Sequence, residues 1–185
     1  MRVLIEVPLL ICDFDGTVAR LHLDWRALKQ RLARAAQGWG MVWDEGAGID
    51  KNLRRLRIEK GGDAFKELCR LIAEEEAAAF DPASVHPVLY EVLRKRRSRP
   101  VGIVSSNTHA ALSQIFNHSI WREITPYIVG KEDVWSGKPS PEGLLKVCHF
   151  FNIDPRNAIY VGDTELDQLA AFQAGITFVN IEQCI

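Results

Sequence analysis

Two aspartates separated by one residue, Asp13 and Asp15, stand at the end of an apolar run and are followed by Gly16. A carboxylate can attack a phosphoryl group and form an acyl phosphate that water later cleaves. A second carboxylate in the following turn can protonate the leaving oxygen and then activate that water. We therefore predict that Asp13 is a nucleophile and Asp15 a general acid and base. An Asp-Gly turn after an apolar run is also a common structural signal, so this pair does not decide the chemistry alone.

Three further residues have groups suited to binding a phosphate. Ser105 and Ser106 follow the apolar residues 101–104, where the Ser105 hydroxyl and the Ser106 backbone amide can donate hydrogen bonds to phosphoryl oxygens. Lys138 lies in the sequence GKPSP, whose prolines restrict the backbone and can hold the ammonium group in place. Such a lysine would offset negative charge on the phosphate and on the nucleophile. The alternatives are a strand end with a helix cap at residues 105–107 and a solvated loop lysine.

Two more aspartates, Asp163 and Asp167, follow the apolar residues 158–161 and are one helical turn apart. Magnesium prefers one or two protein carboxylates together with waters and a substrate phosphate. We predict that Asp163 is a direct ligand and that Asp167 either ligates the ion or orients it through water. The alternative for Asp163 is a helix N-cap, which is compatible with metal binding.

The elements that position these residues follow from the apolar pattern. Short apolar runs predict strands at residues 9–12, 101–104, 127–129, 158–161 and 176–180. From residue 81 onward, strands and helices alternate, which predicts a parallel sheet covered by helices. In such a sheet, ligands bind beyond the carboxyl ends of the strands, near the point where the strand order reverses. Each segment with suggestive chemistry follows a strand or lies in the loop after one, so we expect them to converge.

A different pattern occupies the chain between the first two predicted strands. Helical periodicity without strand-like runs extends from about residue 24 to residue 80, with Asp24 as the expected N-cap of the first helix. The acidic run at residues 74–76 is expected on an exposed helix face. We therefore expect a small all-helical insertion after the first strand, which divides the chain into a core of residues 1–17 and 84–185 and a helical cap of residues 18–83.

Charge and composition limit the class of partner. The chain has 185 residues and a formal net charge of -1, which argues against a nucleic-acid binder that depends on bulk positive charge. The basic run at residues 94–97 is expected to complement a helix end and to stay solvated. The N-terminal apolar stretch is broken by Glu6 and Pro8, so it resembles neither a secretion signal nor a membrane span.

The cysteines are scattered and lie mostly in apolar or helical segments, at Cys12, Cys69, Cys148 and Cys184. This spacing favours reduced, buried thiols over a disulfide framework or a zinc site. We therefore expect a cytoplasmic protein without nucleic-acid or membrane partners, and the sequence leaves the oligomeric state open.

The four motifs, in this order, resemble the haloacid dehalogenase superfamily, specifically its phosphatase-type, phosphoglycolate phosphatase-like members with a helical cap. The resemblance extends from Leu9 to Ile176, although the identifying residues occupy four short stretches. It implies an α/β fold with a Rossmann-like parallel sheet sandwiched by helices, and the insertion corresponds to the cap that many members carry between their first and second motifs.

The resemblance also implies a role for each site residue. Asp13 would be the nucleophile and a magnesium ligand, while Asp15 would supply a carbonyl ligand and a side chain that acts as acid and base. Ser105, with the Ser106 amide, would hold the phosphate. Lys138 would bridge the phosphate and the nucleophile. Asp163 would bind magnesium, and Asp167 would support the metal site.

The function implied is a magnesium-dependent phosphomonoester hydrolase that acts through an aspartyl phosphate on a small phosphorylated metabolite. An acid at Asp15 favours turnover of a phosphate ester, because dehalogenation needs no acid on a leaving oxygen. One alternative is a phosphomutase, which must exclude water from its phosphoenzyme, and a small cap makes such exclusion harder. Another is a non-catalytic binding or scaffold member. Phosphoglycolate, sugar phosphates and nucleotides are all open as substrates.

Overall fold

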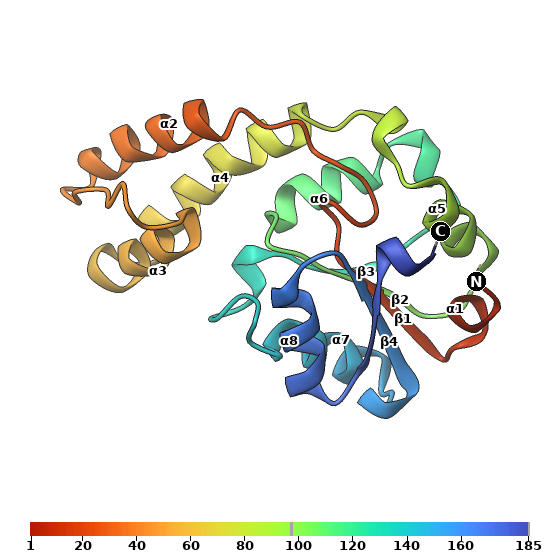
Figure 1. The fold of residues 1–185 in the computed structure, drawn as a ribbon. Coiled ribbons are helices and arrows are strands. Elements are labelled where there is room, and N and C mark those ends of the chain that lie inside the picture. The colour runs from red at the N-terminus through yellow and green to blue at the C-terminus, as the bar shows by residue number, and fades with distance from the viewer. Residues whose placement is uncertain (97, 185) are drawn as a thin grey trace.

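The sheet at the centre of the molecule has five parallel strands in the order β3-β2-β1-β4-β5. The computed structural model describes residues 1–96 and 98–184, of which residue 184 is described without its side chain. The strands are β1 (Leu9–Cys12), β2 (Val101–Val104), β3 (Tyr127–Val129), β4 (Ala158–Gly162) and β5 (Thr177–Asn180). The predicted α/β fold is confirmed (Figure 1).

Helices cover both faces of the sheet, which explains why β1 is apolar along its whole length. Successive side chains of a strand point to opposite faces. Leu10 and Cys12 accordingly join the core beneath α1 (Arg2–Glu6), α5 (Pro87–Arg96) and α6 (His109–Phe116). Leu9 and Ile11 join the core on the opposite face, beneath α7 (Glu142–Phe151) and α8 (Glu165–Ala174) (Figure 1).

The register of the central strands brings their carboxyl ends level with one another. Cys12 at the end of β1 pairs with Ile103 in β2 and with Val161 in β4. The residues that follow these strands therefore share one edge of the sheet. The chain order reverses between β1 and β4, which is the place where open α/β sheets bind ligands.

Three helices form an insertion between β1 and β2, and we call α2–α4 the helical insertion. They are α2 (Trp25–Gly38), α3 (Ile49–Lys60) and α4 (Gly62–Ala78). As predicted, Asp24 caps α2 by accepting hydrogen bonds from the Arg26 and Ala27 amides. The insertion has an apolar core of its own, with Leu32, Leu56 and Leu68 fully buried, and it extends away from the sheet (Figure 1).

The expectation that the basic run is solvated is wrong for Arg96. Its side chain is fully buried, and its guanidinium donates hydrogen bonds to the carbonyls of Leu4, Val7 and Pro100, at 2.7, 3.0 and 2.7 Å. Burial lowers the pKa of Arg96 to about 10. Arg96 therefore fastens the short helix α1 to the end of α5, and Arg97 lies outside the described residues.

The cysteine prediction is confirmed for Cys12, Cys69 and Cys148, which are buried and form no disulfide. The side chain of Cys184 lies outside the described residues. Across the part of the chain that the structure describes, no helix has both the length and the apolar composition needed to cross a bilayer.

Candidate active site

A buried lysine connects two aspartates at the carboxyl edge of the sheet. Lys138 Nζ lies 2.9 Å from Asp13 Oδ1 and 2.5 Å from Asp167 Oδ1. The three side chains are 9%, 6% and 0% exposed, so water screens these charges little. The structure thus brings together three residues, Asp13, Lys138 and Asp167, that the motifs nominated from distant parts of the chain.

Burial and charge shift the titration of this group. Burial raises the pKa of Asp13 to about 6, although Lys138 lowers it in part. Burial lowers the pKa of Lys138, but Asp13 and Asp167 outweigh this effect and hold it above its usual value. Burial likewise raises the pKa of Asp167, but Lys138 and the hydrogen bonds to this carboxylate hold it below its usual value. Lys138 and Asp167 are therefore charged at neutral pH.

Protein donors already occupy both oxygens of Asp167. Tyr160 donates its hydroxyl to Oδ1 at 2.6 Å, beside Lys138. Thr164 donates its backbone amide and its hydroxyl to Oδ2, at 3.0 and 2.5 Å, and this pair forms a capping box at the start of α8. Asp167 is held rigidly, and it holds Lys138 in turn.

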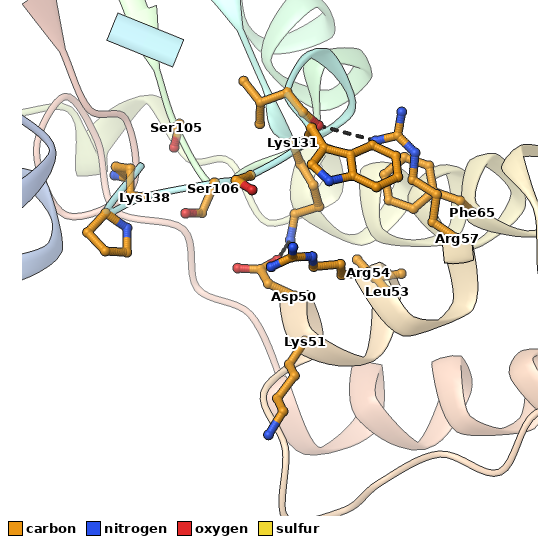
Figure 2. Close-up of a pocket in the computed structure, with 15 residues that line it drawn as sticks. Asp50, Lys51, Leu53, Arg54, Arg57, Phe65, Ser105, Ser106, Lys131 and Lys138 are labelled. Atoms are coloured by element: carbon orange, nitrogen blue, oxygen red, sulfur yellow. Dashed lines mark hydrogen bonds and ion pairs between the residues drawn. The ribbon is translucent and has the colours of Figure 1, made fainter. Parts of the chain in front are cut away.

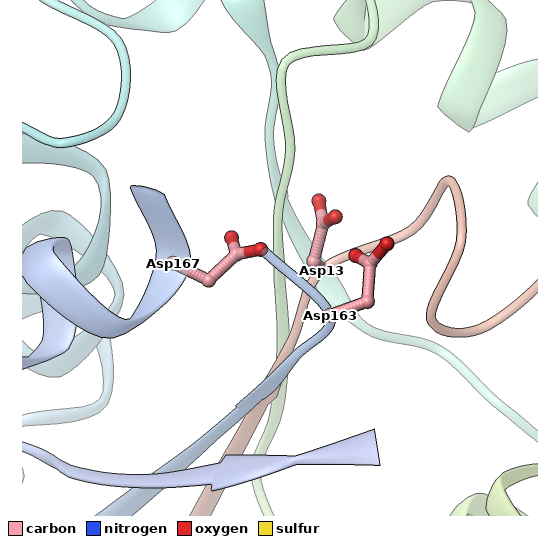
Figure 3. Close-up of side chains that lie close together, drawn as sticks. All are labelled: Asp13, Asp163 and Asp167. Atoms are coloured by element: carbon pink, nitrogen blue, oxygen red, sulfur yellow. The ribbon is translucent and has the colours of Figure 1, made fainter. Parts of the chain in front are cut away.

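Asp163 lies on the other side of Asp13 from Asp167, where two neighbours fix its position (Figure 3). Thr17 donates its hydroxyl to Asp163 Oδ1 at 3.1 Å. Gly16 has a φ of +88°, and a Cβ at this position would lie 2.4 Å from Asp163 Oδ2. The glycine is required both by its backbone conformation and by the close approach of this carboxylate.

Three aspartates form a cluster that fits a divalent cation. Asp13, Asp163 and Asp167 each offer a carboxylate oxygen, and these atoms lie within 4.8 Å of one another (Figure 3). Oxygen-only ligands are those that hard cations such as magnesium prefer. A cation at this point would offset the repulsion between the carboxylates and an incoming phosphate.

Asp15 is not part of that cluster. Its Oδ1 accepts a hydrogen bond from the Leu21 amide at 2.8 Å, and burial raises the pKa of this half-buried carboxyl. It lines a cavity of about 230 Å³ together with Asp13, Ser105 and Lys138. Burial with a raised pKa suits a group that has to carry a proton.

The loop after β2 also lines this cavity, which we call the Asp13 pocket. Ser105 is buried and donates its hydroxyl to Asn107 Oδ1 at 2.8 Å, whereas Ser106 is exposed. The helix cap that was the alternative for residues 105–107 lies one residue later, at Thr108, which caps α6. The two serines are thus left at the strand end, where they line the same cavity as Asp13.

Glu76 corrects the prediction of an exposed acidic face. It belongs to α4 of the helical insertion, and its residue surface is only 2% exposed. Oε1 accepts a hydrogen bond from Asn107 Nδ2 at 2.9 Å, and Oε2 accepts two from Thr108, from its amide at 2.8 Å and its hydroxyl at 2.6 Å. Burial raises the pKa of Glu76. This carboxylate joins the insertion to the loop that carries Ser105.

The motifs did not nominate four residues that shape the site. Thr17 belongs to the DFDGT segment, so its place beside an expected ligand was a usable signal. Tyr160, inside a buried strand, is a polar group that needs a partner. Glu76 and Lys131 carry no local signal, because their partners Thr108 and Asp50 come from distant segments.

Comparison with known proteins adds an independent observation. A family model described as haloacid dehalogenase-like hydrolase matches residues 10–181. Validoxylamine A 7'-phosphate phosphatase of Streptomyces hygroscopicus subsp. limoneus is 29% identical over 181 residues, which cover 91% of this chain and 83% of that protein. A phosphoglycolate phosphatase of Psychrobacter arcticus is 36% identical over 193 residues, which cover 95% of this chain and 84% of the relative.

Solved structures share the fold. The CbbY protein of Rhodobacter sphaeroides, in complex with xylulose-(1,5)bisphosphate, has a TM-score of 0.63 at 18% identity, over 94% of this chain and 85% of that chain. A crystal structure of a putative phosphoglycolate phosphatase from Lactobacillus plantarum has a TM-score of 0.61 at 19% identity, over 96% of this chain and 87% of that chain. At this level of identity, the likeness establishes the fold alone.

Proposed function

Because the chain belongs to the haloacid dehalogenase-like hydrolases and is a phosphatase of that family, we propose that it hydrolyses a small phosphate monoester through an aspartyl phosphate on Asp13, with magnesium as cofactor. The observation that carries the proposal is the buried Lys138 between Asp13 and Asp167. Such a lysine stabilises the ionised nucleophile and would contact a phosphoryl group bound beside it.

The chemistry takes two steps. Asp13 attacks the phosphorus while the bond to the ester oxygen breaks, and Asp15 donates a proton to that departing oxygen. Asp15, now ionised, takes a proton from water as the water attacks the aspartyl phosphate, which releases inorganic phosphate and restores Asp13. Ser105, Ser106 and Lys138 hold the phosphoryl oxygens.

We propose that the Asp13 carboxylate, the Asp15 carbonyl and the Asp163 carboxylate hold the magnesium ion, which supplies positive charge next to the phosphoryl oxygens. Asp167 supports this site. Its oxygens already accept hydrogen bonds from Tyr160 and Thr164, which favours contact with the ion through water over direct ligation.

We further propose that residues 1–17 and 84–185 form the catalytic core and that residues 18–83 form a cap over it. The separate apolar core of the helical insertion supports this division. The substrate is a small phosphorylated metabolite, as the names of the relatives suggest, and not a nucleic acid or a membrane. Buried free cysteines support the cytoplasmic location that we propose.

Phosphate release from a panel of phosphorylated metabolites, measured with magnesium and with EDTA, tests the proposal. We expect release that requires magnesium and that falls at least about 10³-fold in Asp13→Asn. An isomeric ester in place of inorganic phosphate would indicate a phosphomutase. Release that persists in a folded Asp13→Asn variant would remove Asp13 as nucleophile.

A further inference from the structure

A second cavity, of about 310 Å³, adjoins the Asp13 pocket on the side of the helical insertion. Both cavities are lined by Asp50, Ser105, Ser106, Lys131 and Lys138. A ligand whose phosphate lies against Ser105 and Lys138 can therefore extend into the second cavity, which we call the cap-side cavity.

The cap-side cavity is strongly cationic. Its lining contains five basic side chains and one carboxylate: Lys51, Arg54, Arg57, Lys131 and Lys138, with Asp50 as the only acid. A concave site with an excess of one charge raises the local concentration of ligands of the opposite charge.

Most of these cations already have partners. Lys138 is paired with Asp13 and Asp167, and Lys131 Nζ lies 2.5 Å from Asp50 Oδ1. Burial lowers the pKa of Lys131, but Asp50 and Glu76 raise it above its usual value, so this residue is charged at neutral pH.

Arg57 is held in the wall of the cavity. Its guanidinium donates a hydrogen bond to the Val134 carbonyl at 3.2 Å, and it lies 4.8 Å from the ring centre of Phe65 and 4.6 Å from that of Trp135. These rings, with Leu53, give the cavity an apolar surface that suits a short carbon chain.

Lys51 and Arg54 are the two lining cations without a protein partner. Within residues 1–96 and 98–184, neither the Lys51 ammonium nor the Arg54 guanidinium forms a hydrogen bond or an ion pair. In Figure 2 the Arg54 side chain extends from α3 in the direction of Lys131, whereas Lys51 extends away from Ser105 and Ser106, so Arg54 is the better placed of the two. Arginine suits planar or tetrahedral oxyanions, because its donors form a rigid fork.

We propose that the cap-side cavity binds a second anionic group, a carboxylate or a phosphate, at the far end of the substrate, with Arg54 as its main contact. This inference rests on the proposed function, since it places the hydrolysed phosphate against Ser105 and Lys138. It selects doubly anionic esters over esters whose far end is uncharged.

Matched synthetic esters test the inference. Each set has a phosphate at one end of a chain of two to six carbons and a hydroxyl, a carboxylate or a second phosphate at the other. We expect kcat/KM for at least one chain length to be about tenfold higher with a charged far end, mainly through KM. The charged ester with the higher kcat/KM shows whether the far group of the substrate is a carboxylate or a phosphate.

The variant Arg54→Gln should lower kcat/KM for the charged esters about tenfold, to the value that the same variant gives for the hydroxyl ester, and should lower the value for the hydroxyl ester much less. Lys66→Gln is the matched control, because it removes one exposed positive charge from α4 outside the cavity. Equal losses for all three esters in Arg54→Gln, or no preference at any chain length, would overturn the proposal.

Binding to the Asp13→Asn variant separates this inference from the proposed function, because it needs no turnover. By calorimetry, the α,ω-bisphosphate should bind about tenfold more tightly than the hydroxyl ester, and the added Arg54→Gln change should remove the difference. If none of the esters is hydrolysed but this difference appears, the proposed function fails and the anion site stands. If hydrolysis proceeds without the difference, the anion site fails alone.

Discussion

The Glu76 carboxylate accepts hydrogen bonds from both the amide and the hydroxyl of Thr108, at 2.8 and 2.6 Å. Glu76 belongs to the helical insertion, and Thr108 is the N-cap of α6, which covers the sheet. The same carboxylate accepts a hydrogen bond from Asn107, whose side-chain oxygen accepts one from the Ser105 hydroxyl. One buried acid therefore links the helical insertion to Ser105, the serine that we propose binds phosphate.

We expect Glu76→Gln to disturb this network, since the new amide places a donor against donors of Asn107 or Thr108. The free energy of unfolding should fall by about 1–3 kcal/mol in urea denaturation. KM for phosphate esters should rise more than kcat falls, since the chemistry at Asp13 is unchanged. The control Glu75→Gln removes only a surface pair with Arg31 at 2.6 Å, so it should cost less than about 1 kcal/mol. Equal effects of the two variants would contradict a positioning role.

The raised pKa of Asp13 predicts that the nucleophile destabilises the metal-free fold. The pKa of Asp13 is about 6 in the folded protein, against an ordinary value of 3.8. Ionisation of Asp13 therefore lowers the free energy of unfolding, and this loss increases between pH 4 and pH 6. Without magnesium, Asp13→Asn should raise the unfolding free energy by about 1–3 kcal/mol at pH 7.5 and by little at pH 4. Thermal denaturation in EDTA at both pH values measures this difference. A variant that is less stable than the parent protein at pH 7.5 would refute the prediction.

The role of Asp15 in proton transfer predicts a dependence on the leaving group. Asp15→Asn should slow hydrolysis of an alkyl phosphate by about 10²–10⁴-fold, because both the departing oxygen and the attacking water lose their proton carrier. An ester of a more acidic alcohol, such as 4-nitrophenyl phosphate, needs less help in the first step, so aspartyl phosphate should accumulate and give a burst of nitrophenol. Rapid-mixing kinetics can detect this burst, and an unaltered rate for the alkyl ester would exclude the assignment.

The contact between Gly16 and Asp163 predicts a weaker metal site in Gly16→Ala. The added methyl group would lie 2.4 Å from Asp163 Oδ2 and occupy a backbone with a φ of +88°, so the carboxylate has to move. We expect the magnesium concentration for half-maximal activity to rise about tenfold or more. Gly38→Ala is the matched control, because its Cβ would meet no atom within 4 Å. Magnesium titrations that give the same midpoint for the two variants would contradict this explanation.

Much of the fold could be predicted because strong local signals coincide with its elements. β1 to β3 have the predicted bounds, while β4 and β5 differ from theirs by one residue at one end. The helix α1 was not predicted, because five residues are too few to show helical periodicity. Its carbonyls accept hydrogen bonds from the side chain of Arg96, which is distant in the sequence.

The site residues could be nominated from the sequence because each one follows a strand, and parallel strands end at one edge. The positions of Asp13 and Lys138 follow from that rule. Glu76 and Arg96 were misjudged for a common reason. Each lies in a charged run that looks solvated, and each is buried only because a distant backbone supplies donors or acceptors. The local pattern of charges does not show which distant groups will pack against a residue.

The central place of β1 has a mechanical consequence. This strand has a neighbour on each side and helices over both faces, whereas the helical insertion adjoins the phosphate-binding loop through a few polar side chains such as Glu76. The proposed nucleophile, Asp13, thus directly follows a strand that is packed on every side, whereas the proposed anion site lies partly on the insertion. Heat or mutation should loosen substrate discrimination before it slows bond cleavage, which makes the insertion the natural place to alter what this enzyme accepts.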